Sequence, residues 1–348
     1  MKSSVFYSAV RSFFITLFVM LGIGIGFIPV VLIFSLLVSG NDENPEVKTH
    51  FSSTILTDAN GVRKMLPKSA PVILKINVSG FIGSDNLNMY LIREMLTESR
   101  EGEFSNNRIK ALLIHIDSPG GTVTDADGIY RSLNEYKKKY NIPVYGYVDG
   151  MCASGAMYIA SACDKIYASD VSLIGSVGVI SPSFFNFTGL MEKVGVESKT
   201  LFSGKGKDSL NPFRPWKAGE EDNFKALIDY YYTHFVNVVT SNRKDMSKTR
   251  LINDYGANVF PAEKALDFGY IDGANHSLDD TIMLLAKSIG IEDDYYQVIK
   301  MDRKVSFADL FNRGSPMVTG KLNHKLELPN GFDAKLMNQF LYLYLPSE

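Results

Sequence analysis

The stretch that decides the fold is IKALLIHIDSPGG, residues 109–121. Its first nine residues form an apolar run that predicts a buried β-strand, and the proline and two glycines predict a sharp turn at the end of that strand. Apolar, β-branched runs at 71–82 and 143–150 predict two more strands. Amphipathic stretches between these runs predict helices over about 87–99 and 123–139. Apolar strands separated by helices imply a parallel sheet covered on both faces, so we expect an α/β fold with right-handed crossovers.

The alternation continues beyond residue 150. We expect further helices over about 154–163, 188–195, 222–243, 261–268 and 278–289, and further strands over 164–169 and 196–202. Residues 291–348 are expected to form a C-terminal extension, flexible over about 300–335, that ends in the apolar strip FLYLYLPSE. The simplest expectation for this strip is packing on the body or on a neighbour. The alternative is that it lies, extended and substrate-like, in a groove of its own or an adjacent subunit.

Composition limits the class of protein. The 348 residues are 45% hydrophobic and 21% charged, which excludes collagen-like, coiled-coil and mainly disordered chains. Thirty-six Lys and Arg against 38 Asp and Glu give a net charge of −2, so nothing indicates a nucleic-acid partner. Two cysteines cannot supply a disulfide framework or a four-cysteine metal site, and we expect neither a metal nor a cofactor.

Residues 12–38 contain no charged side chain. About 20 apolar residues suffice for a helix to cross a bilayer, so this run predicts a transmembrane anchor. A cleaved secretory signal is the alternative, but its apolar core normally spans only about 7–15 residues.

The charges around the anchor predict its orientation. Lys2 and Arg11 precede the apolar run, and acidic residues follow it. The positive-inside rule then places residues 1–11 in the cytoplasm and the rest of the chain outside a cytoplasmic (inner) membrane that it crosses once. Residues 41–70, polar and broken by prolines and a glycine, are expected to form a stalk, followed by the main domain at 71–290.

The first candidate for chemistry is the turn DSPGG at residues 117–121. Ligands of open α/β sheets bind beyond the carboxyl ends of the strands, which is where this turn is expected. Glycines leave backbone N–H groups unshielded, and N–H groups aimed at one point are what an oxyanion hole requires. A plain glycine-rich turn is the alternative interpretation.

The second candidate is Ser154, at the expected strand-to-helix junction in DGMCASGAMYIA. Its small neighbours leave room for a substrate backbone near the hydroxyl, although a serine at this position is more often only a helix N-cap. Cys152 stands where a G-x-S-x-G elbow needs glycine, so an α/β-hydrolase is excluded.

A serine nucleophile needs a base. The histidines offer no convincing Ser-His-Asp triad; they are His50, His115, His234, His276 and His324. Lysine is the other base known for serine, and the loop FSGKGKDSLNPF offers Lys205 and Lys207.

Taken together, these segments resemble the signal peptide peptidase A family of membrane-anchored serine proteases, in its short, single-copy bacterial form. The matching motifs are IHIDSPGGTVTDA, then ASGAMYIA followed by CDKIYAS, and then SGKGKDSLNPFRP; VSLIGSVGVI and AEKALDFGYIDG are also similar. The resemblance covers about residues 70–275 and includes the N-terminal span.

The resemblance implies a role for four residues. Ser154 matches the nucleophile and Lys207 the general base, while Gly121 and Gly155 would supply the oxyanion N–H groups. It also implies the spiral of ββα units shared by Clp proteases and crotonases. Family members degrade signal peptides after these are cut from exported proteins. The short form assembles as a ring in which the lysine is thought to reach the serine of a neighbouring subunit.

We therefore expect a membrane-anchored serine–lysine endopeptidase of apolar peptides. One alternative is a catalytically inactive, membrane-bound peptide-binding scaffold. Another is a crotonase-like acyl-CoA enzyme, which would share such glycine turns but would be a cytoplasmic chain with a coenzyme-A pocket.

Overall fold

A computed structural model describes most of the chain: residues 5–38, 51–291, 294–304 and 340–344. The chain divides into two units, Met1–Lys48 and Thr49–Glu348, which are described separately. The first contains one helix, α1 (Val5–Val38), within which Tyr7–Val30 is long and apolar enough to cross a membrane. The expected apolar helix is therefore present, and it begins before the uncharged run.

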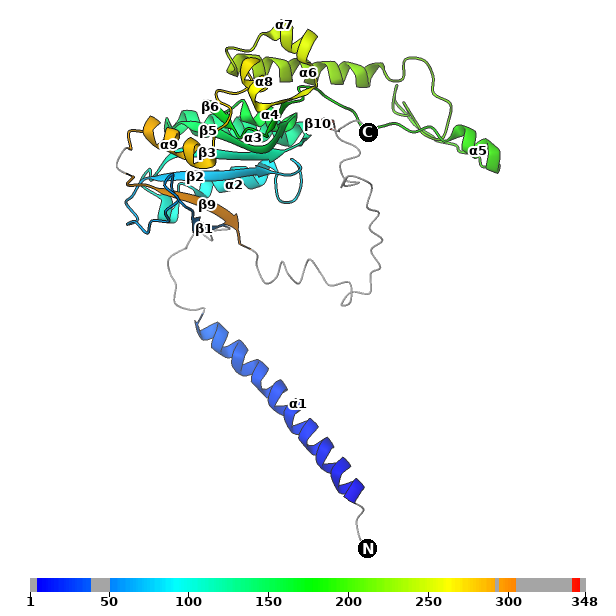
Figure 1. Ribbon diagram of the computed structural model, residues 1–348. Helices are drawn as coiled ribbons and strands as arrows, with labels where there is room; N and C mark the ends of the chain where they lie inside the picture. The colour runs from blue at the N-terminus through cyan, green and yellow to red at the C-terminus, as the bar shows by residue number, and fades with distance from the viewer. Residues whose placement is uncertain (1–4, 39–50, 292–293, 305–339, 345–348) are drawn as a thin grey trace. The chain divides into compact units, whose positions relative to one another are not determined.

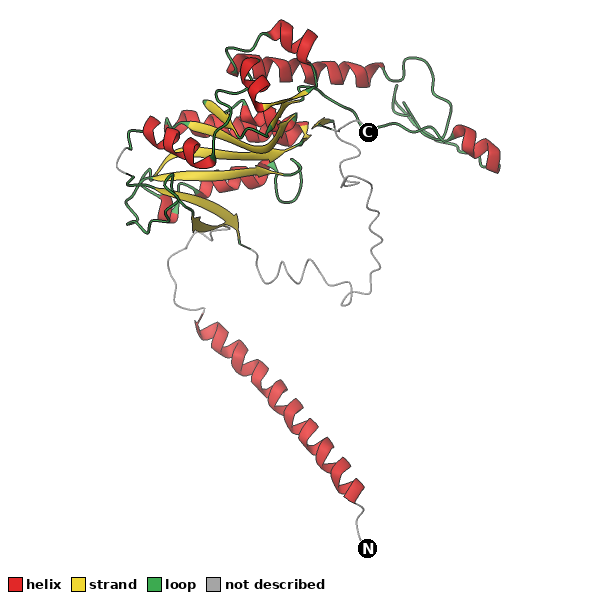
Figure 2. Cartoon of the chain, viewed as in Figure 1, coloured by secondary structure: helices red, strands yellow, loops and turns green. Residues whose placement is uncertain are grey.

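The second unit is built on an eight-stranded, mostly parallel sheet (Figures 1 and 2). Its strands, in spatial order, are β1 (Phe51–Ile55), β9 (Gln297–Arg303), β2 (Val72–Ser79), β3 (Ile109–Ser118), β5 (Val144–Ala153), β7 (Leu173–Gly175) and β8 (Val259–Pro261), with β6 (Lys165–Ala168) also pairing with β5. The pairs β1–β9 and β7–β8 are antiparallel, and the other pairs in this sheet are parallel. The expected α/β class and parallel centre are confirmed.

Helices cover both faces of this sheet (Figure 2). One face packs against α2 (Met89–Glu98), α3 (Val123–Tyr140), α4 (Gly155–Ala160) and α6 (Asp222–Asn242) and forms the larger hydrophobic core. The opposite face packs against α9 (Leu278–Ser288) and forms a smaller core. Side chains alternate along β2, so that Leu74 enters the larger core and Ile73 the smaller one. The remaining helical turns are Gly102–Phe104, α5 (Thr188–Val194), α7 (Lys248–Arg250), Leu251–Tyr255 and α8 (Ala262–Asp267).

Local sequence explains where α3 begins and ends. Thr122 caps its N-terminus by accepting a hydrogen bond from the Asp125 N–H at 3.1 Å. Three lysines fill its last turn, where cations favour the helix dipole, and Asn141 ends it in the left-handed conformation.

Two parts of the chain differ from expectation. The strand expected over 196–202 is wrong: these residues are exposed and pair with no described strand, so their backbone has no partner with which to form a sheet. Strand β1 lies inside the range expected for the stalk, because its backbone pairs with β9.

Two strands of the C-terminal extension pair with strands of the main domain, which is called the body below. Strand β9 belongs to the main sheet, and β10 (Leu341–Leu343) pairs with β4 (Gly120–Thr122). Most of the segment expected to be flexible lies outside the described residues.

Candidate active site

The DSPGG turn is built so that no side chain fits at its glycines. Gly120 has φ +104°, a conformation that favours glycine, and a Cβ there would lie 2.1 Å from the Tyr342 carbonyl oxygen. A Cβ on Gly121 would lie 1.9 Å from the Ile82 carbonyl oxygen. Ser118 fixes the turn, since its hydroxyl accepts from the Gly120 N–H at 3.1 Å. The backbone of the turn therefore packs closely against the backbones of Ile82 and Tyr342.

Ser154 lies between β5 and α4 in a strained conformation, with φ 55° and ψ −116°. A non-glycine residue outside the common backbone regions costs about 1–3 kcal/mol and persists only where its surroundings hold it. The Ser154 N–H donates to the Gly175 carbonyl at 2.9 Å, and its carbonyl accepts from the Tyr158 N–H at 3.0 Å. These two bonds hold the backbone of Ser154 in place.

The Ser154 side chain caps no helix. It is 1% exposed, makes no capping hydrogen bond, and its Oγ has no hydrogen-bond partner among the described residues. Buried hydroxyls are almost always hydrogen-bonded, so an unpartnered one on a strained turn is a mark of a functional site. The helix-cap alternative for this serine is wrong.

The structure brings Gly121 and Gly155 together beside this serine. A Cβ on Gly155 would lie 3.2 Å from the Gly121 nitrogen, and a Cβ on Gly120 would lie 2.8 Å from the Gly155 nitrogen. Two backbone N–H groups next to a serine hydroxyl are the components of an oxyanion hole.

The lysines lie on a different part of the second unit. Residues 180–217, here called the arm, leave the sheet after β7, carry α5 and return to α6 (Figure 1). Lys205 and Lys207 are both exposed on this arm. Because the Ser154 Oγ has no partner among the described residues, neither lysine reaches it within this chain.

The loop that carries Lys207 is nevertheless ordered by ion pairs. Arg214 contacts Asp208 at 2.6 Å and Glu220 at 2.8 Å. The Arg214 guanidinium lowers the pKa of the Asp208 carboxyl, with a further hydrogen bond from Asn211.

Two histidines have carboxylate neighbours, which the sequence did not reveal. His115 Nε2 lies 3.7 Å from Asp149 Oδ2, and His234 Nε2 lies 3.8 Å from Asp127 Oδ1. Burial lowers the pKa of His115. Neither histidine bonds to Ser154 in the part of the chain that the structure describes, so no Ser-His-Asp triad forms there.

Sequence reasoning missed the aromatic residues around the site. Tyr158, Phe235 and Tyr342 are fully buried together. Tyr342 belongs to the C-terminal strip, whose repeated large apolar residues were the only sequence signal. Residue 342 lies far along the chain from β4, so the sequence allowed the alternative that the strip enters a groove but could not predict that it pairs with β4.

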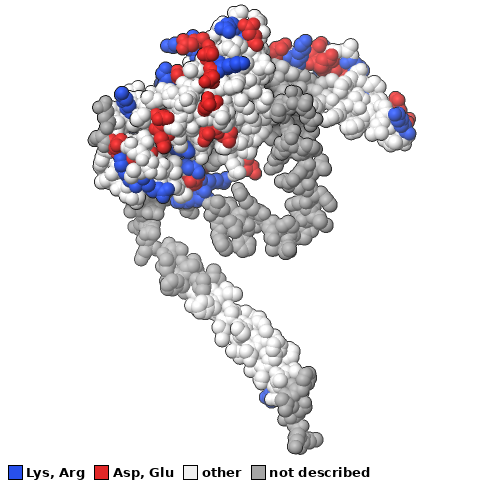
Figure 3. Space-filling model, viewed as in Figure 1, with Lys and Arg blue, Asp and Glu red and all other residues white. Residues whose placement is uncertain are grey.

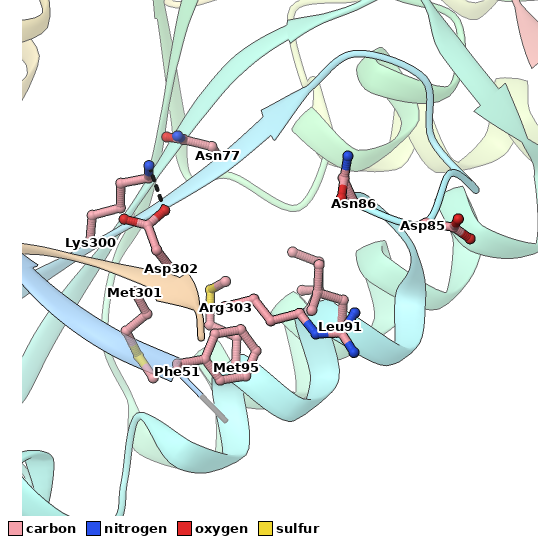
Figure 4. Close-up of a pocket in the computed structure, with 11 residues that line it drawn as sticks. Phe51, Asn77, Asp85, Asn86, Leu91, Met95, Lys300, Met301, Asp302 and Arg303 are labelled. Carbon is pink, nitrogen blue, oxygen red and sulfur yellow. Dashed lines mark ion pairs between the residues drawn. The ribbon is translucent and has the colours of Figure 1, made fainter. Parts of the chain in front are cut away.

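A cavity of about 230 Å³ lies between β9 and α2 (Figure 4). Its polar side chains include Asn77, Asp85 and the ion pair of Lys300 with Asp302 at 2.6 Å. No residue that lines it belongs to the three motifs, so this cavity is separate from the candidate active site. Among the described residues, no group of three or more His, Cys, Asp or Glu side chains could hold a metal ion.

Parts of this chain match models of known protein families. The model of peptidase family S49 matches residues 136–292, which include Ser154 and Lys207, and the Clp protease model matches residues 95–172. A structure of a membrane-bound stomatin-specific protease covers 69% of this chain and is itself fully covered, with a TM-score of 0.40 and 16% identity.

Two bacterial relatives are more similar in sequence. A protein of Enterococcus faecium named as signal peptide peptidase SppA is 32% identical over 216 residues, which are 60% of this chain and 61% of the relative. A protein of Synechocystis named as a protease is 34% identical over 200 residues, which are 58% of this chain and 68% of the relative. With Ser154 and Lys207 inside the residues that this family model matches, and with a relative that is 34% identical and covered over 68% of its length, the chain belongs to peptidase family S49.

Proposed function

We propose that this chain is a membrane-anchored serine endopeptidase that cleaves apolar peptides, including signal peptides released from exported proteins. Ser154 is the nucleophile, Lys207 is the general base, and the N–H groups of Gly121 and Gly155 form the oxyanion hole. The observation that carries the proposal is the buried, unpartnered Ser154 hydroxyl on a strained turn beside two glycine nitrogens.

The proposed reaction has two steps. Ser154 Oγ attacks the peptide carbonyl carbon while its proton passes to the neutral amine of Lys207, and the oxyanion accepts from Gly121 and Gly155. The C–N bond then breaks, and the lysine returns the proton to the leaving amine. A water molecule attacks the acyl-enzyme in the same way, which releases the new carboxylate and restores the serine.

The arm explains how the lysine could reach a serine. It carries many exposed apolar side chains, and Figure 3 shows mostly uncharged atoms along it toward α5. Those more than half exposed are Phe185, Leu190, Val194, Val196, Leu201 and Phe202. A soluble surface rarely leaves so many large apolar side chains uncovered unless they bind something. We assign this surface to a second copy of the chain in a ring-shaped homo-oligomer, where it presents Lys207 to the neighbour's Ser154.

The membrane supplies the proposed substrates. Helix α1 anchors the chain to the bilayer through residues 12–38, in the cytoplasmic membrane, with residues 1–11 inside and the body, 71–290, outside. A catalytic site held near the bilayer meets apolar peptides where they leave it.

The test uses the full chain in detergent with a synthetic signal peptide as substrate. Ser154→Ala should lower the cleavage rate about 10⁴-fold or more, because it removes the nucleophile. Lys207→Ala should lower it about 10²- to 10⁴-fold, because it removes the general base, whereas the matched control Lys205→Ala should change it little. Equal rates for the wild type and Ser154→Ala would refute the proposal, and a loss with Lys205→Ala alone would transfer the base to that residue.

A further inference from the structure

The parallel strands of the main sheet begin at an edge that lies opposite the candidate active site. The DSPGG turn and Ser154 lie at the carboxyl ends of β3 and β5. The other edge, here called the amino edge, is formed where these strands begin, at Ile109 and Val144. The ten residues of β3 place the two edges about 30 Å apart, so a ligand at the amino edge lies far from the proposed catalytic residues.

A cavity of about 740 Å³, here called the amino-edge cavity, opens where the ends of α3 and α9 meet the starts of β2, β3 and β5. Its volume is within the range of sites that hold small molecules. Its lining combines three cationic side chains with three isoleucines: Arg100, Lys110, Lys139, Ile142, Ile289 and Ile291. Among the described residues that line it, none is Asp or Glu. The cavity therefore carries positive charge that no carboxylate in its lining neutralises.

Arg100 is the fixed cation of this cavity. Its guanidinium carbon lies 3.8 Å from the centroid of the Tyr140 ring and 4.6 Å from that of the Tyr136 ring. Its Nη1 donates a hydrogen bond to the Ile109 carbonyl at 3.2 Å. A guanidinium held in this way loses little freedom when it binds a ligand.

The other two nitrogens of the Arg100 guanidinium have no partner. Nε and Nη2 are both buried, and neither has a hydrogen-bond partner in the part of the chain that the structure describes. These two nitrogens form the planar fork with which arginine binds a carboxylate or phosphate bidentately. Buried donors are almost always hydrogen-bonded in native proteins, so the empty fork indicates a place for an anion.

The two lysines of the cavity also lack a counter-charge. Lys110 and Lys139 are exposed, and neither forms an ion pair with a described residue. Lys139 Nζ instead lies 5.3 Å from the centroid of the Tyr140 ring. Lys137 differs from them, because it pairs with Asp164 at 3.0 Å. Three cations around one partly enclosed space attract an anion more strongly than the same charges on an open surface do.

The apolar wall narrows the class of anion. Ile142 packs against the larger core and Ile289 and Ile291 pack against the smaller one, and all three are only partly buried. All three also line the cavity. An inorganic anion gains nothing from this apolar surface, whereas an amphiphile buries its own apolar atoms there. A phosphate-binding fork beside an apolar wall suits an anionic phospholipid.

We propose that the amino-edge cavity binds one anionic phospholipid. The phosphate lies on the Arg100 fork with Lys110 and Lys139 beside it, and the start of an acyl chain lies along Ile289 and Ile291. The inference goes beyond the peptidase proposed above and does not depend on it. It requires only the bilayer that α1 is long and apolar enough to cross. The body then has a lipid contact of its own, in addition to the helix.

The first test measures lipid binding to charge variants. The full chain in an uncharged detergent is titrated with dihexanoyl phosphatidylglycerol, a short and soluble anionic phospholipid, and bound lipid is counted by native mass spectrometry. Arg100→Lys keeps the charge but removes the fork, so it should weaken binding about tenfold. Lys110→Gln and Lys139→Gln should each weaken it about fivefold.

The matched control is Lys138→Gln, which changes the neighbour of Lys139 on α3 at a position that does not line the cavity. It should leave the affinity unchanged. Lipid bound to α1 is common to all variants, so only the difference between them reports on the cavity. Both lysines of the cavity are exposed, so their variants are expected to fold as the wild type does. Equal affinities for the wild type, Lys110→Gln and Lys139→Gln would overturn the proposal.

Two further ligands separate a lipid from a free anion. Dihexanoyl phosphatidylcholine has the same chains but no net charge, and it should bind about tenfold more weakly. Inorganic phosphate should bind about 100-fold more weakly in calorimetry, because it buries no apolar atoms. Ile291→Ser should weaken phosphatidylglycerol about fivefold and leave inorganic phosphate unchanged. Equal affinities for phosphate and phosphatidylglycerol would assign the cavity to a free anion and refute the lipid, and equal affinities for the two lipids would refute selection by charge.

The second test uses a bilayer. The full chain is placed in nanodiscs of phosphatidylglycerol mixed with phosphatidylcholine, or of phosphatidylcholine alone, and its lysines are acetylated by a water-soluble reagent and quantified by mass spectrometry. Lys110 and Lys139 should react about threefold or more slowly in the anionic nanodiscs, because bound lipid covers them, whereas Lys138 should react equally in both. The same rates for Lys110 and Lys139 in both nanodiscs would contradict the proposal. Failure of the peptidase is seen separately, as equal cleavage rates for the wild type and Ser154→Ala.

Discussion

Helices α4 and α5 are nearly equal in length, but they differ completely in burial. All six residues of α4, which follows Ser154, are buried, and no residue of α5, on the arm that carries Lys207, is buried. The body therefore completes its half of the proposed dyad by its own packing. The arm does not position Lys207, the other half of the proposed dyad, by its own packing, because its apolar side chains contact solvent within this chain.

This difference has a simple physical meaning. Burial of apolar surface stabilises the body without a partner, and it holds Ser154 in a conformation that an exposed loop would relax. The arm gains the same free energy only when another surface covers it. The proposed site is then complete only in an assembly, and three experiments probe this contrast.

The largest expected effect comes from mixing two inactive chains. Ser154→Ala and Lys207→Ala are co-expressed as full-length chains, and peptide cleavage is measured. If the arm of one copy serves the body of the next, random mixing joins an intact serine to an intact lysine at about one quarter of the sites. Activity should recover to about that fraction of wild type.

Each variant expressed alone is the control and should stay inactive. A mixture as inactive as its components would mean that each chain supplies its own lysine, and the contrast between arm and body would lose its functional meaning.

A smaller effect is expected from breaking an ion pair inside the body. Arg243, 6% exposed, contacts Asp272 at 2.5 Å. Burial opposes the ionisation of Asp272, but Arg243 and Lys165 outweigh it and hold the pKa of this carboxyl below its ordinary value. Asp272→Asn should lower the free energy of unfolding by about 3 kcal/mol, because it leaves the guanidinium buried without a counter-charge.

Chemical denaturation of the full chain measures this change, and the exposed Asp267→Asn is the matched control, with an expected change within about 0.5 kcal/mol. If Asp272→Asn changed the free energy of unfolding as little as Asp267→Asn does, the buried ion pair with Arg243 would not stabilise the body.

The smallest effect on stability is expected in the arm. Leu201 is 85% exposed, so Leu201→Ser should change the free energy of unfolding by less than about 0.5 kcal/mol. It should nevertheless shift the assembly toward smaller species in analytical ultracentrifugation, since it removes an apolar contact between copies. Val171→Ser, at 83% exposure on the body, is the control and should leave the assembly unchanged. The same sedimentation for wild type and Leu201→Ser would contradict the assignment of the arm as an interface.

The parts of the site that sequence predicted are those encoded locally. The strand before DSPGG and the junction at Ser154 follow from residues adjacent in the chain, and parallel strands bring their carboxyl ends to one edge. The strand predicted over 196–202 is absent because these residues are exposed on the arm and no described strand lies beside them, and local sequence does not show whether a segment has a partner strand.

The contacts that sequence could not predict are long-range. The pairing of Tyr342 with Gly121 joins residues far apart in the chain, and the ring contact of Tyr158 with Phe235 depends on where α6 crosses α4. The base stays a prediction, because no described contact joins Lys207 to Ser154.

The pairing of β10 with β4 has a consequence for how the two ends of the site respond to dilution. A strand tethered to the body that it occupies meets its groove at an effective concentration independent of the amount of protein. A lysine delivered by another copy is lost as copies separate. Under the proposed assembly, dilution would leave β10 paired with β4 but would separate Ser154 from the lysine of a neighbouring copy, so the cleavage rate should fall as the protein is diluted.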